Sequence, residues 1–232
     1  MKPADPSLRR CHWQAALFAS AVAAALLLTG CASARRAAAL TRGWVQKPFT
    51  YTIQYPYDLK PADRYQYDQK RNIHDFWINY TDKPHLPPPN RTTARTEMRL
   101  ENFNSGEHMF DADVNVSPGT FACIAQVFDD KHGPVLMLVA HPDGKITVGP
   151  QSVIGTNVLG RWWNLKITND PVPDGRIRIY INNLPAGTYR NRGSRDYYFK
   201  CGVYSRKGSA RSEARFRNIR VWVKKQEVAA GQ

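Results

Sequence analysis

Short segments in which apolar and polar residues alternate dominate the chain from about residue 95 onward. MFDADVNV (109–116) places a phenylalanine, an alanine and two valines at every second position, and RIRIYI (176–181) does the same with three isoleucines. Such a period of two is typical of strands with one buried face. PVLMLVA (134–140) is a continuous apolar run, which predicts a strand covered on both faces.

Turn residues separate these segments at short intervals. Asp143-Gly144 joins PVLMLVA to KITVG, and Asp174-Gly175 precedes RIRIYI, so both dipeptides predict tight turns between strands. No convincing long helical pattern appears in the sequence. Many short strands in about 190 residues predict an all-β fold, a two-sheet antiparallel sandwich or jelly roll.

The first 43 residues have a different pattern. Basic residues in 1–14 precede an apolar run of 14 residues (15–28), the length of a signal-peptide core and short for a membrane span. Leu28-Thr29-Gly30-Cys31 then resembles a bacterial lipobox, in which the cysteine is acylated. The alternative is a plain signal peptide with a chance cysteine.

These features predict an exported lipoprotein. Residues 1–30 are expected to be the signal peptide, 31–43 a tether lipidated at Cys31, 44–225 the β-jelly-roll domain, and 226–232 a C-terminal tail. Ala32 after the cysteine favours the outer membrane by resemblance to sorted lipoproteins. The lipid is then the expected membrane anchor, and no other membrane segment is predicted.

Basic residues outnumber acidic ones, 33 to 19 over the whole chain. Without residues 1–30 the counts are 30 and 18, so the formal charge of +12 belongs to the domain. Such a field attracts polyanions. Composition alone does not choose among nucleic acid, anionic lipid and acidic polysaccharide. The basic residues are spread out, no nucleic-acid motif appears and the predicted export argues against it, so nucleic acid is not the expected partner. A monomer is expected.

Several kinds of chemistry find no signal in the sequence. There is no glycine-rich phosphate loop, no metal-ligand cluster and no G-x-S-x-G motif, so neither a metal nor an organic cofactor is predicted. Two cysteines remain in the domain, Cys123 and Cys201. Export permits a disulfide between them, and two buried free thiols are the alternative.

Three segments each combine an apolar face with a polar one. Alternation places Arg95, Glu97 and Arg99 on one face of RTEMR. The same rule places Gln126 with Phe128, opposite Cys123, Ala125 and Val127, and places Lys200, Gly202 and Tyr204 together. Gly202 is expected to leave room for a ligand. The alternative is that these are ordinary solvated faces, and Glu97 is expected to be the ion-pair partner of its two arginines.

These segments resemble the signature strands of the alginate lyase 2 superfamily, the polysaccharide lyases of family 7 and their relatives. RTEMR, QVF and YYFKCGVY correspond to R-S/T-E-L-R, Q-I/V-H and Y-F-K-x-G-x-Y. QYPYDL, FWINYTDKPH, RWWNLKI and IYIN extend the likeness over residues 50–223 to a branch with plant citrate-binding proteins, similar to fungal glucuronan lyases. The resemblance implies a concanavalin-like jelly roll with a concave binding face.

The resemblance also implies roles in β-elimination, the cleavage of a 4-linked uronic acid. Arg95 and Gln126 would neutralise the substrate carboxylate and stabilise the enolate. Tyr204 would serve as acid, and also as base. Lys200 and Arg99 would bind substrate carboxylates, with a solvated sheet lysine as the alternative for Lys200. The family mechanism needs no organic cofactor.

One position departs from the family pattern. Family 7 has a histidine, the usual neutraliser and base, where this chain has Phe128, which transfers no proton. His85, in TDKPH, is the predicted substitute base, and a turn-packing histidine beside Pro84 is the alternative. Phe128 is then expected to stack on a sugar, as are Trp77 or Trp162.

Two functions follow from this pattern. The first is a polysaccharide lyase that acts on an alginate- or glucuronan-type polymer. The second is a binding protein for acidic carbohydrate or a small carboxylate, without turnover, which the loss of the family histidine favours.

Overall fold

The computed structural model describes residues 34–89, 92–150, 152–193 and 196–225. It divides the chain into two units, one ending at Arg42 and one beginning at Gly43. In the first unit, residues 34–41 form a short helix. No helix among the described residues is long and apolar enough to cross a membrane. The predicted signal peptide and the lipidation site Cys31 lie outside the described residues.

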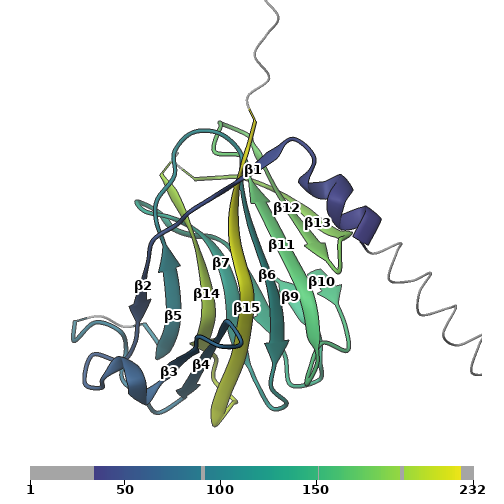
Figure 1. Ribbon diagram of the computed structural model, residues 1–232. Coiled ribbons are helices and arrows are strands. Elements are labelled where there is room, and N and C mark those ends of the chain that lie inside the picture. Colours follow the sequence, from purple (N-terminus) through teal and green to yellow (C-terminus); the bar gives the residue numbers. More distant parts are fainter. Residues whose placement is uncertain (1–33, 90–91, 151, 194–195, 226–232) are drawn as a thin grey trace, which may run out of the picture. The chain divides into compact units, whose positions relative to one another are not determined.

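The second unit is a sandwich of two antiparallel sheets (Figure 1). The eight-stranded sheet has the order β13-β12-β11-β6-β15-β4-β3, with β1 also paired to β15. Its strands are β1 (Trp44–Lys47), β3 (Tyr65–Asp68), β4 (Ile73–Asn79), β6 (His108–Val116), β11 (Trp162–Asn169), β12 (Arg176–Ile181), β13 (Leu184–Arg190) and β15 (Arg211–Lys224).

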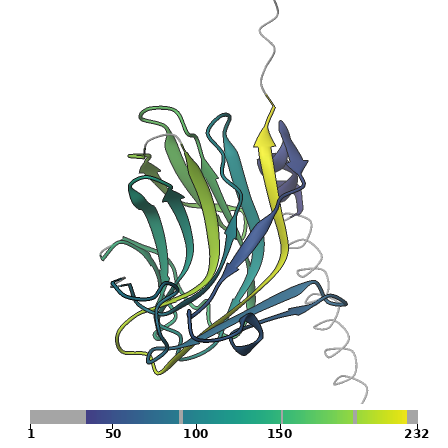
Figure 2. The same cartoon turned by 90° about the vertical axis from the view of Figure 1, so that its left-hand side faces the viewer.

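The seven-stranded sheet has the order β10-β9-β8-β7-β14-β5-β2. Its strands are β2 (Tyr51–Gln54), β5 (Arg95–Leu100), β7 (Ala122–Asp129), β8 (Gly133–Ala140), β9 (Ile146–Val148), β10 (Ser152–Gly155) and β14 (Tyr197–Ser205). A 3-10 turn, η1 (Pro61–Asp63), precedes β3. The two layers are seen from another side in Figure 2.

The core fills the space between the sheets. Its largest members come from both layers, with Phe76, Phe110 and Phe216 from the eight-stranded sheet and Met98 and Phe199 from the other, all almost fully buried. Each such side chain contributes about 1.5–3 kcal/mol relative to exposure. The predicted all-β sandwich is confirmed, and so is the inward alternation of MFDADVNV, whose alternating residues Phe110, Ala112, Val114 and Val116 are all core members.

The two predicted turns also lie between strands. Gly144 has a φ of +81° between β8 and β9, and Asp174 has a φ of +61° before β12. The prediction that PVLMLVA is covered on both faces is wrong. Leu136, Leu138 and Ala140 of β8 belong to the core, whereas Met137 and Val139 line hollows on the other face of the sheet.

A bulge in β7 overturns the predicted side of Cys123. The register of β7 with β8 shifts between Cys123 and Ala125, so Ile124 is an extra residue and alternation changes phase there. Ile124 and Ala125 both join the core, and Cys123 lies directly opposite Tyr204, on the Gln126 side. Cys201 faces the core, and both cysteines are free thiols. Burial raises the pKa of each thiol.

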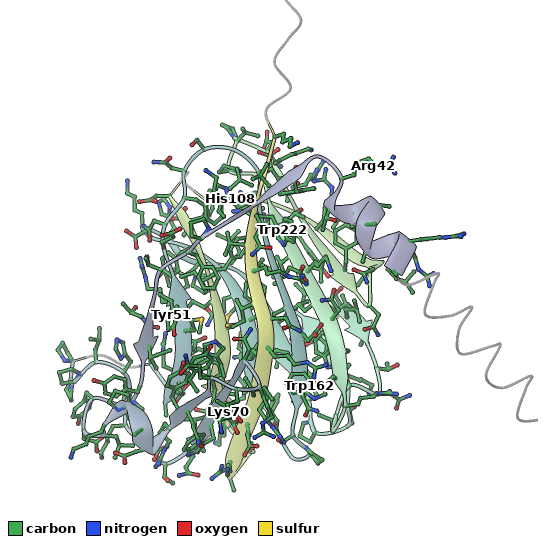
Figure 3. The ribbon with its side chains drawn as sticks, viewed as in Figure 1. Arg42, Tyr51, Lys70, His108, Trp162 and Trp222 are labelled. Atoms are coloured by element: carbon green, nitrogen blue, oxygen red, sulfur yellow. The ribbon has the colours of Figure 1, made fainter. Side chains whose placement is uncertain are left out.

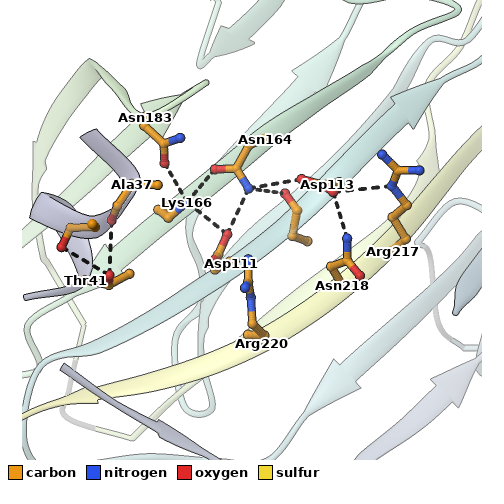
Figure 4. A network of polar contacts seen from close by, with 12 residues as sticks. Ala37, Thr41, Asp111, Asp113, Asn164, Lys166, Asn183, Arg217, Asn218 and Arg220 are labelled. Atoms are coloured by element: carbon orange, nitrogen blue, oxygen red, sulfur yellow. Dashed lines mark hydrogen bonds and ion pairs between the residues drawn. The ribbon is translucent and has the colours of Figure 1, made fainter. Parts of the chain in front are cut away.

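The outer face of the eight-stranded sheet carries a polar network (Figure 4). Buried Asp111 lies 3.1 Å from the Lys166 ammonium and 3.0 Å from Arg220, and Asp113 pairs with Arg217 at 3.3 Å. Much of the positive charge on this face is therefore already neutralised.

The two tryptophans expected to stack on a sugar both belong to this sheet. Trp77 lies in β4 and Trp162 in β11, and arginines of β15 cover both rings, Arg217 at 4.3 Å from Trp162 and Arg211 at 5.6 Å from Trp77. Figure 3 labels Trp162, together with Trp222 of β15. Neither Trp77 nor Trp162 lines the groove described below, so the expectation that they stack on its ligand is not supported.

Candidate functional site

The three signature segments form three adjacent strands, β7, β14 and β5, in the seven-stranded sheet. Lys200 of β14 lies opposite both Gln126 of β7 and Arg99 of β5, and Tyr204 lies opposite Arg95. Directly opposed residues of an antiparallel pair share a face. Strand pairing therefore brings together side chains that are more than a hundred residues apart in sequence.

All of these side chains except that of Arg99 line a groove of about 430 Å³, within the size range of ligand pockets. Six of the predicted residues line it, Arg95, Gln126, Lys200, Tyr204, His85 and Phe128. The other lining residues are Gln54, Leu86, Thr92, Pro134, Met137, Tyr198 and Arg206.

Glu97 is a buried anion that contacts Arg95, Lys200 and Gln126. It is 0% exposed, and one of its oxygens accepts a hydrogen bond from Gln126 Nε2. Its other oxygen lies 3.5 Å from Arg95 Nη1 and 3.7 Å from Lys200 Nζ. The expectation that Glu97 pairs with two arginines holds for Arg95 only, because Lys200 takes the place of Arg99.

Lys200 is more enclosed than a substrate-binding lysine on an open sheet. Its side chain is 2% exposed, and Nζ donates a hydrogen bond to Gln54 Oε1 at 2.9 Å. Burial lowers the pKa of Lys200, an effect that the Glu97 carboxylate opposes. The ammonium therefore already has protein partners, and the solvated-lysine alternative does not describe it.

Phe128 occupies the position of the family histidine. Its ring is stacked on Tyr198, with centroids 5.0 Å apart, and the Lys200 ammonium lies 4.6 Å from its centroid. The half-buried ring lines the groove, so an apolar and aromatic surface stands where a proton-transferring group is expected from the resemblance. Contact with a sugar stays a prediction.

Arg99 reaches the groove only indirectly. It shares the predicted face, but its guanidinium lies over Tyr198, 3.9 Å from the ring centroid, and donates to Asn102 Oδ1 at 2.6 Å. It also lies 3.5 Å from Asp130. Arg99 does not line the groove but supports the ring of Tyr198, which does. Its contact with substrate stays a prediction.

His85 is held in one orientation by the backbone. Its Nδ1 lies 3.0 Å from the Tyr55 carbonyl oxygen. A carbonyl oxygen only accepts hydrogen bonds, so Nδ1 carries the proton and Nε2 of the neutral ring is left as an acceptor. The loop that carries the ring is anchored by the Tyr57 N–H, which donates to Pro84 O at 3.0 Å. A base at this edge of the groove is therefore chemically available.

Tyr204 and Arg95 form a stacked pair on the groove wall. The Arg95 guanidinium carbon is 4.3 Å from the centroid of the Tyr204 ring. Tyr204 is half-buried, and its hydroxyl is a proton donor of the type that a leaving group requires. Arg95, Gln126, Tyr204 and His85 thus provide a cation, an amide, a phenol and an imidazole along one groove.

Gly202 serves the backbone rather than a ligand. It has a φ of +137°, and a Cβ at this position would lie 2.4 Å from Thr96 O of the neighbouring strand. The register of β14 with β7 also shifts between Cys201 and Tyr204. The prediction that Gly202 leaves room for a ligand is therefore wrong, because the missing side chain makes room for β5.

Sequence reasoning missed Gln54, Met137 and Arg206, which line the groove. Gln54 lies on an edge strand outside the signature motifs, and Met137 was assigned to a doubly covered strand. Arg206 follows Tyr204 by two residues, where the strand has ended, and the only signal for it was that proximity. Among the described residues, no group of three or more His, Cys, Asp or Glu side chains gathers as a metal site would require.

Comparison with known proteins places these observations in a family. A family model described as alginate lyase matches residues 49–225. A citrate-binding protein from Hevea brasiliensis is 29% identical over 190 residues, 78% of this chain and 78% of that protein.

Solved structures show the same fold at low identity. The alginate lyase AlgAT5 of polysaccharide lyase family 7 superposes with a TM-score of 0.58 and 16% identity over 74% of this chain and 93% of that one. An alginate lyase from Pseudomonas aeruginosa gives 0.56 and 15% over 74% and 97%. The jelly roll, the adjacent signature strands and a family match that covers most of the described domain lead to one conclusion: the chain belongs to the alginate lyase 2 family.

Proposed function

We propose that the protein is a polysaccharide lyase that cleaves a 4-linked uronic-acid polymer, of the alginate or glucuronan type, by β-elimination. The observation that carries the proposal is the single groove that holds Arg95, Gln126, Tyr204 and His85. Family membership and the shared fold support the same activity class.

The chemistry begins with the substrate carboxylate. The C5 proton of a uronate is weakly acidic while the adjacent carboxylate is charged, so donors must neutralise that charge and stabilise the enolate. Gln126 Nε2 carries two N–H groups and gives one to Glu97, which leaves the second for the substrate. Arg95 supplies the cation.

Proton transfer completes the elimination. His85 Nε2 takes the C5 proton, and the electron pair of that C–H bond forms the C4–C5 double bond as the C4–O bond breaks. The Tyr204 hydroxyl gives its proton to the leaving oxygen. The products are a chain with an unsaturated uronate at its new end and a chain with a free hydroxyl.

A second function is favoured by one observation. Phe128 replaces the family histidine with a ring that transfers no proton, and a citrate-binding protein is among the relatives. In this reading the same cation and amide bind the carboxylates of a carbohydrate or small acid, and no bond is broken.

Unsaturated uronates absorb in the ultraviolet, which separates the two functions. The purified protein is incubated with alginate and with glucuronan, and absorbance is followed with time, while binding of the same polymers is measured in parallel. Growth of absorbance on either polymer, and none on its carboxyl-reduced form, is the result expected for a lyase. Binding with flat traces on both polymers would establish the binding protein and overturn the lyase.

A further inference from the structure

Arg206 is a half-buried cation that forms no ion pair with any described carboxylate. Among the described arginines that form no ion pair it is the one that is not exposed, and its Nε is buried without a hydrogen-bond partner. By contrast, Arg95 and Arg99 in the same sheet both pair with carboxylates. A partly desolvated guanidinium without an anion carries a free-energy cost that an anionic ligand would relieve.

The position of Arg206 is fixed by the backbone around it. Its N–H donates to Phe121 O at 3.1 Å, and the N–H of Ser205 donates to Ala94 O at 3.0 Å. Residue 206 is thus held between the segments that lead into β7 and β5. Such pre-organisation lowers the entropy cost of using the side chain for recognition.

Arg206 stands where two hollows of the sheet meet. It lines the groove described above and also a second hollow of about 630 Å³ over β8 and β9, and Pro134 and Met137 line both as well. Most of the second hollow is apolar, with Val139 and Phe121 among its lining residues. The register places Met137 directly beside Gln126, so the two hollows are one strand step apart.

We infer that Arg206 binds the carboxylate of the sugar next to the one held by Arg95 and Gln126, so that the protein selects ligands with two neighbouring uronates. The inference rests on the proposed binding of a uronic-acid chain. Adjacent strands are about 4.7–4.9 Å apart, so a chain that crosses the sheet from Tyr204 toward β8 passes over the junction of the hollows. The guanidinium fork suits a carboxylate there.

The apolar floor makes this one contact decisive for the neighbouring sugar. The side chains of Met137 and Val139 donate no hydrogen bonds, and the polar side chains of the second hollow already have partners, His141 with Thr147 and Tyr189 with Ser152. Among the described residues, Arg206 is the one arginine or lysine that lines this hollow, so a charged ligand unit over β8 depends on it for its carboxylate. A chain that alternates uronates with neutral sugars, or a single uronate, gains nothing from this residue.

The test measures binding by calorimetry to tetramannuronate, tetraglucuronate and a methyl monouronate, in a Tyr204→Phe background in which turnover is expected to be slow. For whichever tetrauronate the parent binds, Arg206→Ala is expected to raise the Kd by about tenfold to a hundredfold. It should leave the Kd for the monouronate unchanged. Arg206→Lys keeps the charge without the planar fork, so its Kd for the tetrauronate should lie between those of the parent and of Arg206→Ala.

Lys207→Ala is the matched control, because it removes one positive charge from the next residue, which is exposed and lines neither hollow. If Arg206→Ala behaves as Lys207→Ala does while Arg95→Ala abolishes binding, the role of Arg206 is overturned and the proposed function stands. If the parent binds neither tetrauronate, both are overturned. Equal thermal midpoints for the two alanine variants show that a loss of affinity is not a loss of fold.

Discussion

Arg95 lies directly opposite Tyr204 in the β5–β14 ladder, and its guanidinium carbon is 4.3 Å from the centroid of the phenol ring. The two side chains that the proposed reaction assigns to charge neutralisation and proton donation therefore hold one another in place. Loss of the hydroxyl alone leaves this stack intact, which makes Tyr204 the residue at which binding and turnover are most cleanly separated.

Tyr204→Phe is expected to lower turnover by about a hundredfold to ten-thousandfold, the usual contribution of a general acid, with little change in affinity. Steady-state absorbance and calorimetry with an oligouronate measure the two quantities. Arg95→Ala is the comparison that should weaken both. Full activity of Tyr204→Phe would remove the phenol from the mechanism.

His85→Gln tests the proposed base. Glutamine keeps a side-chain N–H for the Tyr55 carbonyl but supplies no imidazole Nε2, so turnover should fall by about a hundredfold or more. Affinity for an oligouronate should change little. His132→Gln is the control, since His132 is an exposed histidine that does not line the groove. Unchanged turnover in His85→Gln would leave Tyr204 as the sole proton-transfer group.

Glu97→Gln tests the anion that holds the site together. The substitution keeps the shape but leaves Arg95 and Lys200 without their shared carboxylate, so the free energy of unfolding should fall by about 2–4 kcal/mol. Glu213→Gln is the control, because Glu213 pairs with the exposed Arg211 on the eight-stranded sheet and should contribute at most about 1 kcal/mol. Urea denaturation compares them, and equal losses would contradict a central role for Glu97.

Gly202→Ala tests the close approach of β14 to β5. The new Cβ would meet Thr96 O at 2.4 Å in a backbone conformation that disfavours side chains. The free energy of unfolding is therefore expected to fall by about 1–3 kcal/mol or more. Gly160→Ala separates the strain of the backbone conformation from the clash with Thr96 O, because Gly160 also has a positive φ, +70°, but has open space around it. If the free energy of unfolding falls no more in Gly202→Ala than in Gly160→Ala, β5 shifts to accommodate the new methyl group and the close approach is not decisive.

His74 should make stability depend on pH. Its imidazole is buried against Tyr67 and bonded to the Tyr65 hydroxyl, and burial lowers its pKa to about 4, from an ordinary 6.5. Between these values the unfolded chain binds more protons, so the free energy of unfolding should fall by about 2 kcal/mol as the pH drops from 6.5 to 4.

Substitution of His74 isolates this contribution. His74→Phe keeps an aromatic ring and removes the titration, so the part of the slope due to His74 should disappear from denaturation midpoints measured between pH 4 and 6.5. His132→Gln, at a side chain that is 56% exposed, should preserve that slope. A slope that survives in His74→Phe would assign the effect to other groups.

The alternation of residues predicted the faces of the signature strands wherever the strands are regular. Arg95, Gln126, Lys200 and Tyr204 do share a face, since a period of two is a local property of an extended chain. Cys123 was placed on the wrong side because Ile124 adds a residue to β7, and such a bulge is set by pairing with a neighbouring strand that the local pattern does not contain.

The remaining errors concern contacts of a side chain with residues of other strands, which the local sequence does not contain. Met137 sits in an apolar run that predicts cover on both faces, and only the tertiary structure shows one face open to the groove. The lack of a partner for Arg206 depends on which carboxylates come near it in space. The burial of Lys200 likewise results from Glu97, Gln54 and Phe128 converging from three other strands.

The strand order has a consequence for when the site comes into existence. β14 pairs with β7 on one side and β5 on the other, yet it is contributed by residues 197–205, late in the chain. A growing polypeptide therefore cannot assemble the groove until β14, the last strand of the seven-stranded sheet in chain order, has inserted between β7 and β5. A partly unfolded molecule that releases β14 loses the groove. A ligand that binds in the groove therefore binds only the molecule in which β14 is in place. Its binding free energy stabilises the whole sandwich against unfolding, and not one loop alone.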